Sequence, residues 1–174
     1  MNILSVMKHR RSVRQYTGET IPQETLEQVL KAGLTSATGR AKRPWEFVVV
    51  RDKEVLQKMA DCRTGGAKML EGADCAIVVI ADPDKTDVWV EDASIAMANM
   101  HLAADALGLG SCWIQGRLRE AADGSSTETY LRKLLHYPDT YRLEAILSLG
   151  VPASHAPAYE DSDLHMEKIH YEKY

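Results

Sequence analysis

The chain has 174 residues, of which 45% are hydrophobic and 26% are charged. This length is enough for one globular domain with a substantial core, spanning residues 1–174, and is too short for two ordinary domains. The 21 lysines and arginines stand against 25 aspartates and glutamates, which gives a formal net charge of −4. That balance argues against a general binder of nucleic acid or of anionic membranes, since such proteins usually carry a basic excess.

The cysteines and the first residues of the chain indicate a compartment. Cys62, Cys75 and Cys112 are odd in number and form no CxxC pair, so a disulfide scaffold is not expected and a reducing compartment fits better. Cations from Lys8 onward come too early for a signal peptide. The longest other apolar run, Cys75–Ala81, is far shorter than a membrane span. We therefore expect a cytoplasmic protein with no membrane partner.

The start of the chain predicts two helices and a loop. Asn2 is a natural N-cap for a short, largely apolar helix. Pro22 is expected in the first turn of a second helix. Apolar residues follow it at helical spacing, and Gly33 marks the end of that helix. Residues 35–44 are polar and are expected to form a loop.

The next segment predicts two strands that flank a helix. The strands are expected over residues 46–50 and Cys75–Ala81, with a helix over residues 53–62 and a short turn around Lys68 between them. The acidic stretch 82–87 lacks the turn glycine and the closing glutamate of a calcium loop. We interpret its acids as turn residues and as the cap of the following helix.

The most informative element is a helix expected over residues 88–107. Its apolar residues cover most of the circumference rather than one stripe, and such a helix must be buried nearly all round. A chain of this length has little material to wrap it, so we infer an obligate homodimer with this helix at the interface. The alternative is a central helix packed wholly within one chain. Five small residues permit close approach of a neighbour: Ala93, Ala96, Ala98, Ala103 and Ala104.

Two further strands and one helix are expected in the rest of the chain. The strands are predicted over residues 111–114 and 142–149. Between them, Ser125 and Glu128 have the spacing of a capping box at the start of a helix. A polar, acidic tail begins at Ala153. Helices therefore alternate with about four strands, which indicates a layered α+β or α/β domain.

Positive charge is concentrated at the start of the chain. Residues 1–18 contain Lys8, Arg10, Arg11 and Arg14 and no acid, which leaves 17 cations against 25 acids, a net charge of −8, in the remainder. A compact cationic cluster on an acidic protein suggests one bound anion rather than a long polyanion. The alternative is a solvated basic helix end, which is common.

The familiar motifs of side-chain catalysis are absent. The sequence has no GxSxG, no HExxH, no P-loop and no complete GxGxxG. Gly108 and Gly110 follow a helix, which is the wrong context for a dinucleotide turn. The six histidines are scattered without metal-ligand spacing, so no metal site is expected. Chemistry is therefore expected from a bound organic cofactor rather than from a nucleophilic side chain or a metal.

Seven motifs, in order along the chain, resemble those of the FMN-dependent nitroreductase family. They are Arg10-Arg11-Ser12-Val13-Arg14-x-Tyr16, Thr38-Gly39-Arg40, Pro44-Trp45-Glu46-Phe47, Trp89-Val90-Glu91-Asp92-Ala93, Gly108-Leu109-Gly110-Ser111-Cys112-Trp113-Ile114, Ser148-Leu149-Gly150-Val151-Pro152 and Lys168-Ile169-His170-Tyr171. The resemblance implies an α+β class domain with a nitroreductase-like three-layer α/β/α fold. It also implies a mixed, mostly antiparallel sheet and a long central helix at a homodimer interface.

The resemblance further implies which residues bind FMN. Arg10 and Ser12 would hold the phosphate and the ribityl chain, with Arg11 adding a backbone contact or a second cation. Arg14 would reach the pyrimidine edge of the flavin, where a fixed cation stabilises the reduced state. Lys68 resembles a family lysine that serves the same edge.

Backbone groups and a second chain complete the site that the resemblance implies. Gln115 and Gly116 correspond to a place where backbone N–H groups face flavin N5, and glycine allows a close approach to the ring. Thr38 and Gly39 resemble residues that reach the flavin from the partner subunit. Many family members also place an arginine near the C-terminus on the phosphate, but residues 153–167 contain no arginine or lysine. Phosphate binding is therefore expected to depend more on the N-terminal arginines.

The resemblance implies a homodimeric FMN oxidoreductase. NAD(P)H is the expected reductant and would give hydride to flavin N5. A small-molecule electron acceptor, such as a nitroaromatic, a quinone or an enone, would then take the electrons. No general acid is identifiable, so the part of the protein is orientation and electrostatics. The alternative function is a non-catalytic protein that binds flavin or another phosphorylated ligand.

Overall fold

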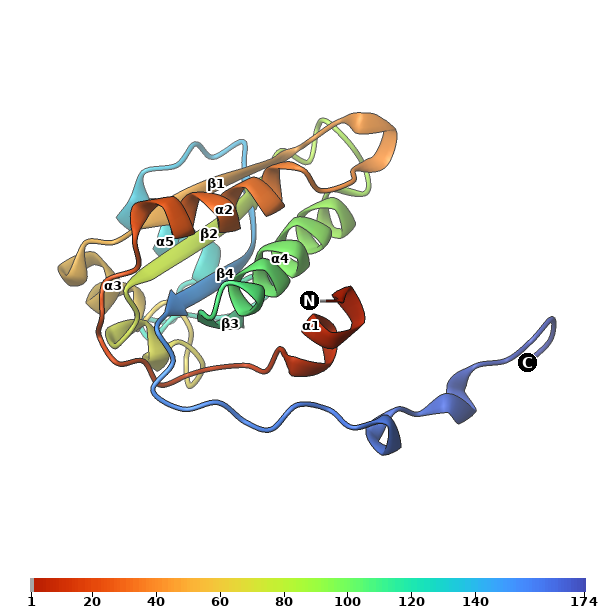
Figure 1. Cartoon of the computed structure of the whole chain (residues 1–174). Helices are drawn as coiled ribbons and strands as arrows, with labels where there is room; N and C mark the ends of the chain where they lie inside the picture. The colour runs from red at the N-terminus through yellow and green to blue at the C-terminus, as the bar shows by residue number, and fades with distance from the viewer. Residues whose placement is uncertain (1) are drawn as a thin grey trace.

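The computed structural model describes residues 2–174 and contains a four-stranded sheet with helices on both faces (Figure 1). The helices are α1 (Ile3–His9), α2 (Gln23–Leu34), α3 (Lys53–Met59), α4 (Trp89–Ala106) and α5 (Thr127–Leu135). The strands are β1 (Trp45–Val50), β2 (Cys75–Ala81), β3 (Gly110–Gln115) and β4 (Arg142–Gly150). Among the described residues, no helix is both long enough and apolar enough to cross a membrane.

The sheet has the strand order β1-β2-β4-β3, and each neighbouring pair of strands is antiparallel. Every residue of β2 is buried, and so is every residue of β4 after Arg142, because these two central strands are covered on both faces. An isolated parallel bridge joins Ser12 to Ser111 at the start of β3. The four strands pair only in the antiparallel sense, so within residues 2–174 this bridge is the only parallel pairing that corresponds to the expected mixed sheet.

Alternate residues of the central strands face two separate cores. Ile77 and Val79 of β2 pack with α2 and α4, whereas Val78 and Ile80 pack with α3 and α5. This alternation is the period of two that a strand imposes on its side chains. The arrangement confirms the three-layer α/β/α fold and the α+β class that the sequence predicts.

Gly33 and Pro22 occupy other places in α2 than the sequence predicts. Pro22 precedes the helix as its N-cap, and Gly33 lies inside the helix rather than beyond its end. A Cβ on Gly33 would come within 2.9 Å of the Met100 sulfur and of the Phe47 ring. The glycine is therefore required for close packing of α2 against α4 and β1, and the prediction of a helix stop was wrong.

Three other predicted helix boundaries also differ. The helix expected over residues 53–62 ends at Met59, since the chain turns away after Ala60. The N-cap of α5 is Ser126, whose hydroxyl accepts from the Thr129 N–H, so the capping box predicted at Ser125 was wrong. The N-cap of α4 is Val88, which makes no side-chain cap, so the acids of residues 82–87 do not cap this helix.

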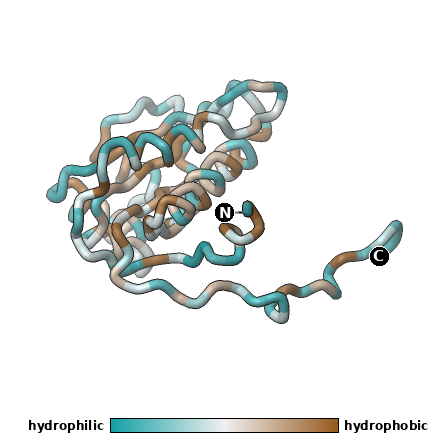
Figure 2. The backbone as a smooth tube through the Cα atoms, in the orientation of Figure 1, coloured by the Kyte–Doolittle hydropathy of each residue, from teal (hydrophilic) through white to brown (hydrophobic). Residues whose placement is uncertain are grey.

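The end of the tail after β4 extends away from the layered body, whereas α1 lies beside α4 (Figure 1). Large apolar side chains of α1 are exposed, and short hydrophobic stretches recur along the outstretched tail (Figure 2). Helix α4, expected to be buried nearly all round, leaves Ile95 42% exposed in the single chain. One chain therefore does not cover all the apolar surface of its central helix.

Candidate functional site

The segment from Arg10 to Arg14 lies beside the first residues of β3. The Val13 N–H donates to the Ser111 carbonyl over 2.9 Å, next to the bridge between Ser12 and Ser111. A pocket of about 310 Å³ is formed there by arginine, serine and tail residues, and its lining is Arg10, Arg11, Ser12, Arg14, Ala156 and Tyr159. We call it the arginine pocket. It brings four of the predicted cofactor-binding residues together.

Arg10 is held by a buried histidine rather than by a carboxylate. Its Nη1 lies 3.0 Å from Nε2 of His101, and Nδ1 of His101 lies 2.5 Å from Oγ of Ser111. Because a guanidinium only donates hydrogen bonds, Nε2 accepts and Nδ1 carries the proton. Burial, together with the charge of Arg10, lowers the pKa of His101 to about 4. The imidazole is therefore neutral at pH 7, and Arg10 keeps its full charge.

The first part of the tail closes the arginine pocket from the other side. Arg11 donates to the Pro157 carbonyl and lies over the Tyr159 ring, 4.5 Å from the ring centroid. The Tyr159 N–H donates to the Lys8 carbonyl over 2.9 Å, and the Lys8 ammonium lies 2.9 Å from Asp161. The tail is thus fastened to α1 and to the arginine segment of its own chain.

Arg63 is a further cation that sequence reasoning missed, and it lines a small pocket with Thr64 and Arg119 rather than the arginine pocket. Burial raises the pKa of the Cys112 thiol, and the guanidinium groups of Arg14, Arg10 and Arg63 act against that rise. Arg63 therefore lies within electrostatic reach of β3. Its side chain passes over Gly66, where an added Cβ would lie 2.7 Å from the Arg63 Nε. The glycine pair after it was the one local signal that a side chain folds back here.

Lys68 lies at the start of a 3₁₀ turn, Lys68–Glu71, and is paired with two acids. Its ammonium is 3.1 Å from Glu71 and 3.4 Å from Asp61. The hydrogen bond to Glu71, followed by the one to Asp61, raises the pKa of Lys68. The structure does not bring Lys68 among the residues that line the arginine pocket.

Thr38 and Gly39 lie near the beginning of α4, away from the arginine pocket of the same chain. The Gly39 N–H donates to Asp92 Oδ1 over 2.8 Å, and a Cβ on Gly39 would lie 2.8 Å from Val88 Cγ2. Arg10, in contrast, contacts His101, which is more than two turns further along α4. Within one chain, the two groups of predicted site residues are therefore separated along this helix.

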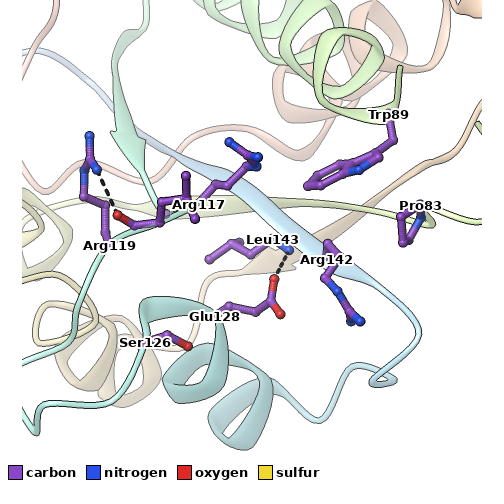
Figure 3. Close-up of a pocket in the computed structure, with 10 residues that line it drawn as sticks. Pro83, Trp89, Arg117, Arg119, Ser126, Glu128, Arg142 and Leu143 are labelled. Atoms are coloured by element: carbon purple, nitrogen blue, oxygen red, sulfur yellow. Dashed lines mark hydrogen bonds between the residues drawn. The ribbon is translucent and has the colours of Figure 1, made fainter. Parts of the chain in front are cut away.

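A second pocket, of about 420 Å³, opens beside Gly116 at the end of β3 (Figure 3). Its lining includes three arginines, and Arg117 lies over the Trp89 ring, 5.7 Å from the ring centroid. The full lining is Pro83, Trp89, Gly116, Arg117, Leu118, Arg119, Ser126, Glu128, Arg142 and Leu143. We call it the Trp89 pocket. Its aromatic wall and its cations suit a planar, anionic molecule.

Close packing explains the glycine at position 116. A Cβ there would lie 2.5 Å from Leu143 Cδ2. The Gly116 N–H donates to the Glu144 carbonyl over 3.3 Å, and that carbonyl accepts a shorter bond of 2.9 Å from the Arg117 N–H. The Gln115 side chain accepts from Trp113 Nε1 over 2.9 Å. These contacts fix the main chain where β3 meets the Trp89 pocket.

Glu144 of β4 is a buried acid near the same turn. It is only 3% exposed, and burial raises its carboxyl pKa. The Ser94 hydroxyl donates to Oε1 over 3.3 Å, whereas Oε2 has no partner among the residues that the structure describes. Sequence reasoning found no acid of this kind, although a lone glutamate inside an apolar strand is a signal that could have identified it.

A sequence model described as "Nitroreductase family" matches residues 7–62 and 60–151. The chain belongs to the nitroreductase family. The two matched ranges contain every predicted site residue from Arg10 to Gly116, while the tail after residue 151 lies beyond them.

Individual nitroreductases match over nearly the whole chain. A protein from Archaeoglobus fulgidus, named "Putative NADH dehydrogenase/NAD(P)H nitroreductase", is 39% identical over 98% of each chain. The solved structure of an FMN-dependent nitroreductase from Clostridium difficile R20291 is 44% identical, with a TM-score of 0.95 over 98% of this chain and 99% of that one. A "putative nitroreductase in complex with fmn" from Desulfovibrio desulfuricans is 26% identical, with a TM-score of 0.76 over 98% and 99% of the two chains. This chain therefore has the nitroreductase fold and is an oxidoreductase of that family.

Proposed function

We propose that the protein is a homodimeric FMN-dependent oxidoreductase that uses NAD(P)H to reduce a small-molecule acceptor. The observation that carries this proposal is the arginine pocket, in which three guanidinium groups and a hydroxyl gather with no carboxylate in the lining. A phosphate monoester of nearly two negative charges fits such a donor set. The names of the relatives, which include FMN and NAD(P)H, support the same cofactor and reductant.

The residues divide the binding of FMN between them. Arg10, Arg11 and Ser12 bind the phosphate and the ribityl chain, and His101 keeps Arg10 oriented without reducing its charge. Arg14 faces the pyrimidine edge, and the second cation at that edge comes from Arg63 or from Lys68. When bound, FMN supplies the chemistry that accepts hydride from NAD(P)H and passes electrons to an oxidised acceptor such as a nitroaromatic, a quinone or an enone.

We expect the reacting edge of the flavin ring to lie beside the main chain of Gln115 and Gly116. Gln115 is the last residue of β3, and Gly116 follows it and lines the Trp89 pocket. Arg117 and Arg119 put positive charge at that pocket, which favours the anionic NAD(P)H. The same pocket then admits the acceptor, so the two substrates bind in turn.

A second chain of the homodimer supplies Thr38 and Gly39 to the FMN site. The proposal is supported by the apolar surface that one chain leaves open, including Ile95 and Ala98 on α4 and Ile3 and Met7 on α1. Ile3 shares a groove with Leu102 and Ala106 of α4, and exposed apolar residues that gather in this way mark an interface. The three cysteines are free and buried, which suits a reducing, cytoplasmic location.

Anaerobic reduction tests this function. The protein is purified, supplied with FMN, freed of unbound cofactor and titrated with NADH and with NADPH under nitrogen. We expect the oxidised-flavin absorbance to disappear with one of them and to return on adding an acceptor. A protein that binds FMN but is not reduced is a flavin-binding protein and not the proposed enzyme, and a protein with no affinity for FMN overturns the proposal entirely.

A further inference from the structure

Two histidines and one aspartate converge where α1, the end of α4 and the tail meet. His9 is the last residue of α1, Asp105 lies in the last turn of α4, and His155 lies in the tail. The His9 Nδ1 is 2.9 Å from Oδ2 and 3.0 Å from Oδ1 of Asp105, and the His155 Nε2 is 3.5 Å from Oδ1. All candidate ligand atoms lie within 4.8 Å of one another.

The hydrogen bonds of His155 leave one nitrogen as an acceptor. Its Nδ1 lies 2.6 Å from the Ala156 carbonyl, and because a carbonyl only accepts, Nδ1 carries the proton. In the neutral ring, Nε2 then presents a lone pair toward the Asp105 carboxylate. Nε2 and Asp105 Oδ1 lie 3.5 Å apart, and either a second proton on the ring or a metal ion between the two atoms would make this contact favourable. A histidine whose other nitrogen is fixed by a carbonyl is the usual arrangement of a metal ligand.

The charge of Asp105 is also poorly balanced by the rest of the chain. Its side chain is only 5% exposed, and its ionic partners among the described residues are His9 and His155. Within residues 2–174, no lysine or arginine pairs with the Asp105 carboxylate. A buried carboxylate without a permanent cation is costly, and a divalent ion would balance it.

We propose that His9 Nδ1, His155 Nε2 and the Asp105 carboxylate bind a divalent transition-metal ion of the Zn²⁺ type. Two imidazole nitrogens and a carboxylate oxygen are ligands that Zn²⁺ accepts at about 2.0–2.2 Å. Because a ligating lone pair lies in the plane of its imidazole ring, the stacked rings of His9 and His155 must rotate apart as the cluster closes on the ion. His9 is half exposed, which leaves a fourth position open to water. The ligands lie 96 and 50 residues apart in sequence, so no spacing motif announces the site.

The metal would act as a clasp between the tail and the arginine pocket. His155 directly precedes Ala156, which lines that pocket with Tyr159. The stacked rings of His9 and His155, with centroids 4.4 Å apart, already join α1 to the tail. A shared ion would replace this stack and would join both segments to the end of α4. The clasp thus holds the tail wall of the pocket in place, whatever anion the pocket binds.

Calorimetric titration of the chelator-treated full-length protein with ZnCl2 tests the site. We expect one ion per chain, and at least a tenfold weaker affinity in His9→Ala, His155→Ala and Asp105→Asn. His165→Ala is the matched control, because His165 is also in the tail but pairs with Glu167 instead, and it should bind like the wild type. Absence of binding, or equal affinity in the three ligand variants and the wild type, overturns the proposal.

Spectroscopy and exchange distinguish this site from adventitious binding. Co²⁺ bound through nitrogen and oxygen should give visible bands without the near-ultraviolet absorption of a thiolate ligand, which excludes the cysteines. Zn²⁺ should slow hydrogen exchange of the Tyr159 amide, which donates to Lys8, in the wild type and not in Asp105→Asn. Protection by Zn²⁺ that is equal in both proteins would mean that the three residues form only a hydrogen-bonded cluster.

Discussion

At the scale of single residues, the charge of the arginine pocket depends on a histidine that stays neutral. His101 is only 7% exposed, accepts from Arg10 through Nε2 and donates to Ser111 through Nδ1. Burial first, and then the charge of Arg10, lowers its pKa to about 4, while Asp105 acts in the opposite direction. Protonation of His101 would remove the acceptor that orients Arg10 and would put a second buried cation beside it.

This arrangement predicts a stability that falls in acid. The pKa of His101 is about 4 in the folded chain, against an ordinary value of 6.5 for histidine, so between these pH values the unfolded chain binds a proton that the folded chain does not. The stabilisation is complete above pH 6.5 and is lost as the pH approaches 4, an effect of about 3 kcal/mol. Urea denaturation with a chelator present measures it against His101→Gln, whose amide accepts from Arg10 but cannot titrate. Equal pH dependence in both proteins would contradict the prediction.

Arg10→Ala should weaken binding of FMN far more than binding of riboflavin. The loss of a charge-assisted hydrogen bond to phosphate costs about 1.5–3 kcal/mol, which is roughly a 10- to 150-fold increase in Kd. Riboflavin lacks the phosphate, so its affinity should hardly change. Fluorescence quenching of both flavins measures the two constants, with circular dichroism as the check on folding. A similar loss for both flavins would place Arg10 away from the phosphate.

Arg63 and Lys68 are the two candidates for the second positive charge beside the flavin ring. We expect Arg63→Ala to weaken riboflavin and FMN to the same extent, because both molecules contain the ring. Lys68→Ala should change neither affinity by more than about twofold, since Asp61 and Glu71 already balance its charge. The dissociation constants of riboflavin and FMN for the two variants distinguish the candidates. Weaker binding in Lys68→Ala with unchanged binding in Arg63→Ala would assign the role to Lys68.

The difference between these residues shows what a sequence can reveal about a site. The segment from Arg10 to Arg14 is continuous, so its charges are visible as a cluster before any folding is considered. His101 and Glu144 join the site regions only through contacts made across the fold, and Arg63 does so only through its charge. No local sequence pattern predicts such long-range proximity, so the roles of these three residues can be seen only in the structure.

At the scale of elements, α4 has more apolar surface than one chain can cover. Seven of its residues are buried, but its apolar positions continue round the helix to Ile95 and Ala98, which are exposed. A groove of about 280 Å³ lies alongside, between α1, α2 and α4. On α1, Ile3 and Met7 are also exposed, and Ile3 lines this groove together with Leu102 of α4. A second copy is the partner that fits an interface of this kind.

Ile95→Glu should therefore convert dimers into monomers. A carboxylate placed at the middle of an apolar interface loses its hydration without gaining a partner, so we expect at least a tenfold increase in the dimer dissociation constant. Sedimentation equilibrium measures it. Val49→Glu is the control, because Val49 is similarly exposed but lies on the edge strand β1. An unchanged dimer in Ile95→Glu would exclude this face of α4 from the interface.

The elements themselves were largely predictable because their patterns are local. The strand Cys75–Ala81 has the predicted bounds, since a run of apolar residues flanked by turn residues records a strand buried on both faces. The helix end predicted at Gly33 was wrong because glycine is common both at helix ends and at close helix contacts. Only the positions of Met100 and Phe47 reveal which reason applies.

At the scale of the whole molecule, the two groups of predicted cofactor residues lie toward opposite ends of α4. Gly39 contacts Asp92 in the first turn, and Arg10 contacts His101 near the end. A single chain that used both groups on one flavin would have to bring these ends together. Two chains that pair through α4 in opposite directions would place the first group of each beside the second group of the other. The proposed dimer therefore predicts two composite sites.

Subunit complementation tests this prediction. Arg10→Ala removes a pocket residue, and Thr38→Trp introduces a bulky ring where the partner's flavin would lie, so either homodimer should bind FMN weakly. In a mixed dimer of one chain of each kind, one composite site contains both substitutions and the other contains neither. Differently tagged chains, co-expressed and isolated as the mixed dimer, should therefore bind one FMN per dimer with wild-type affinity. If each site were built within one chain, both sites would carry a substitution, and no tight binding would return.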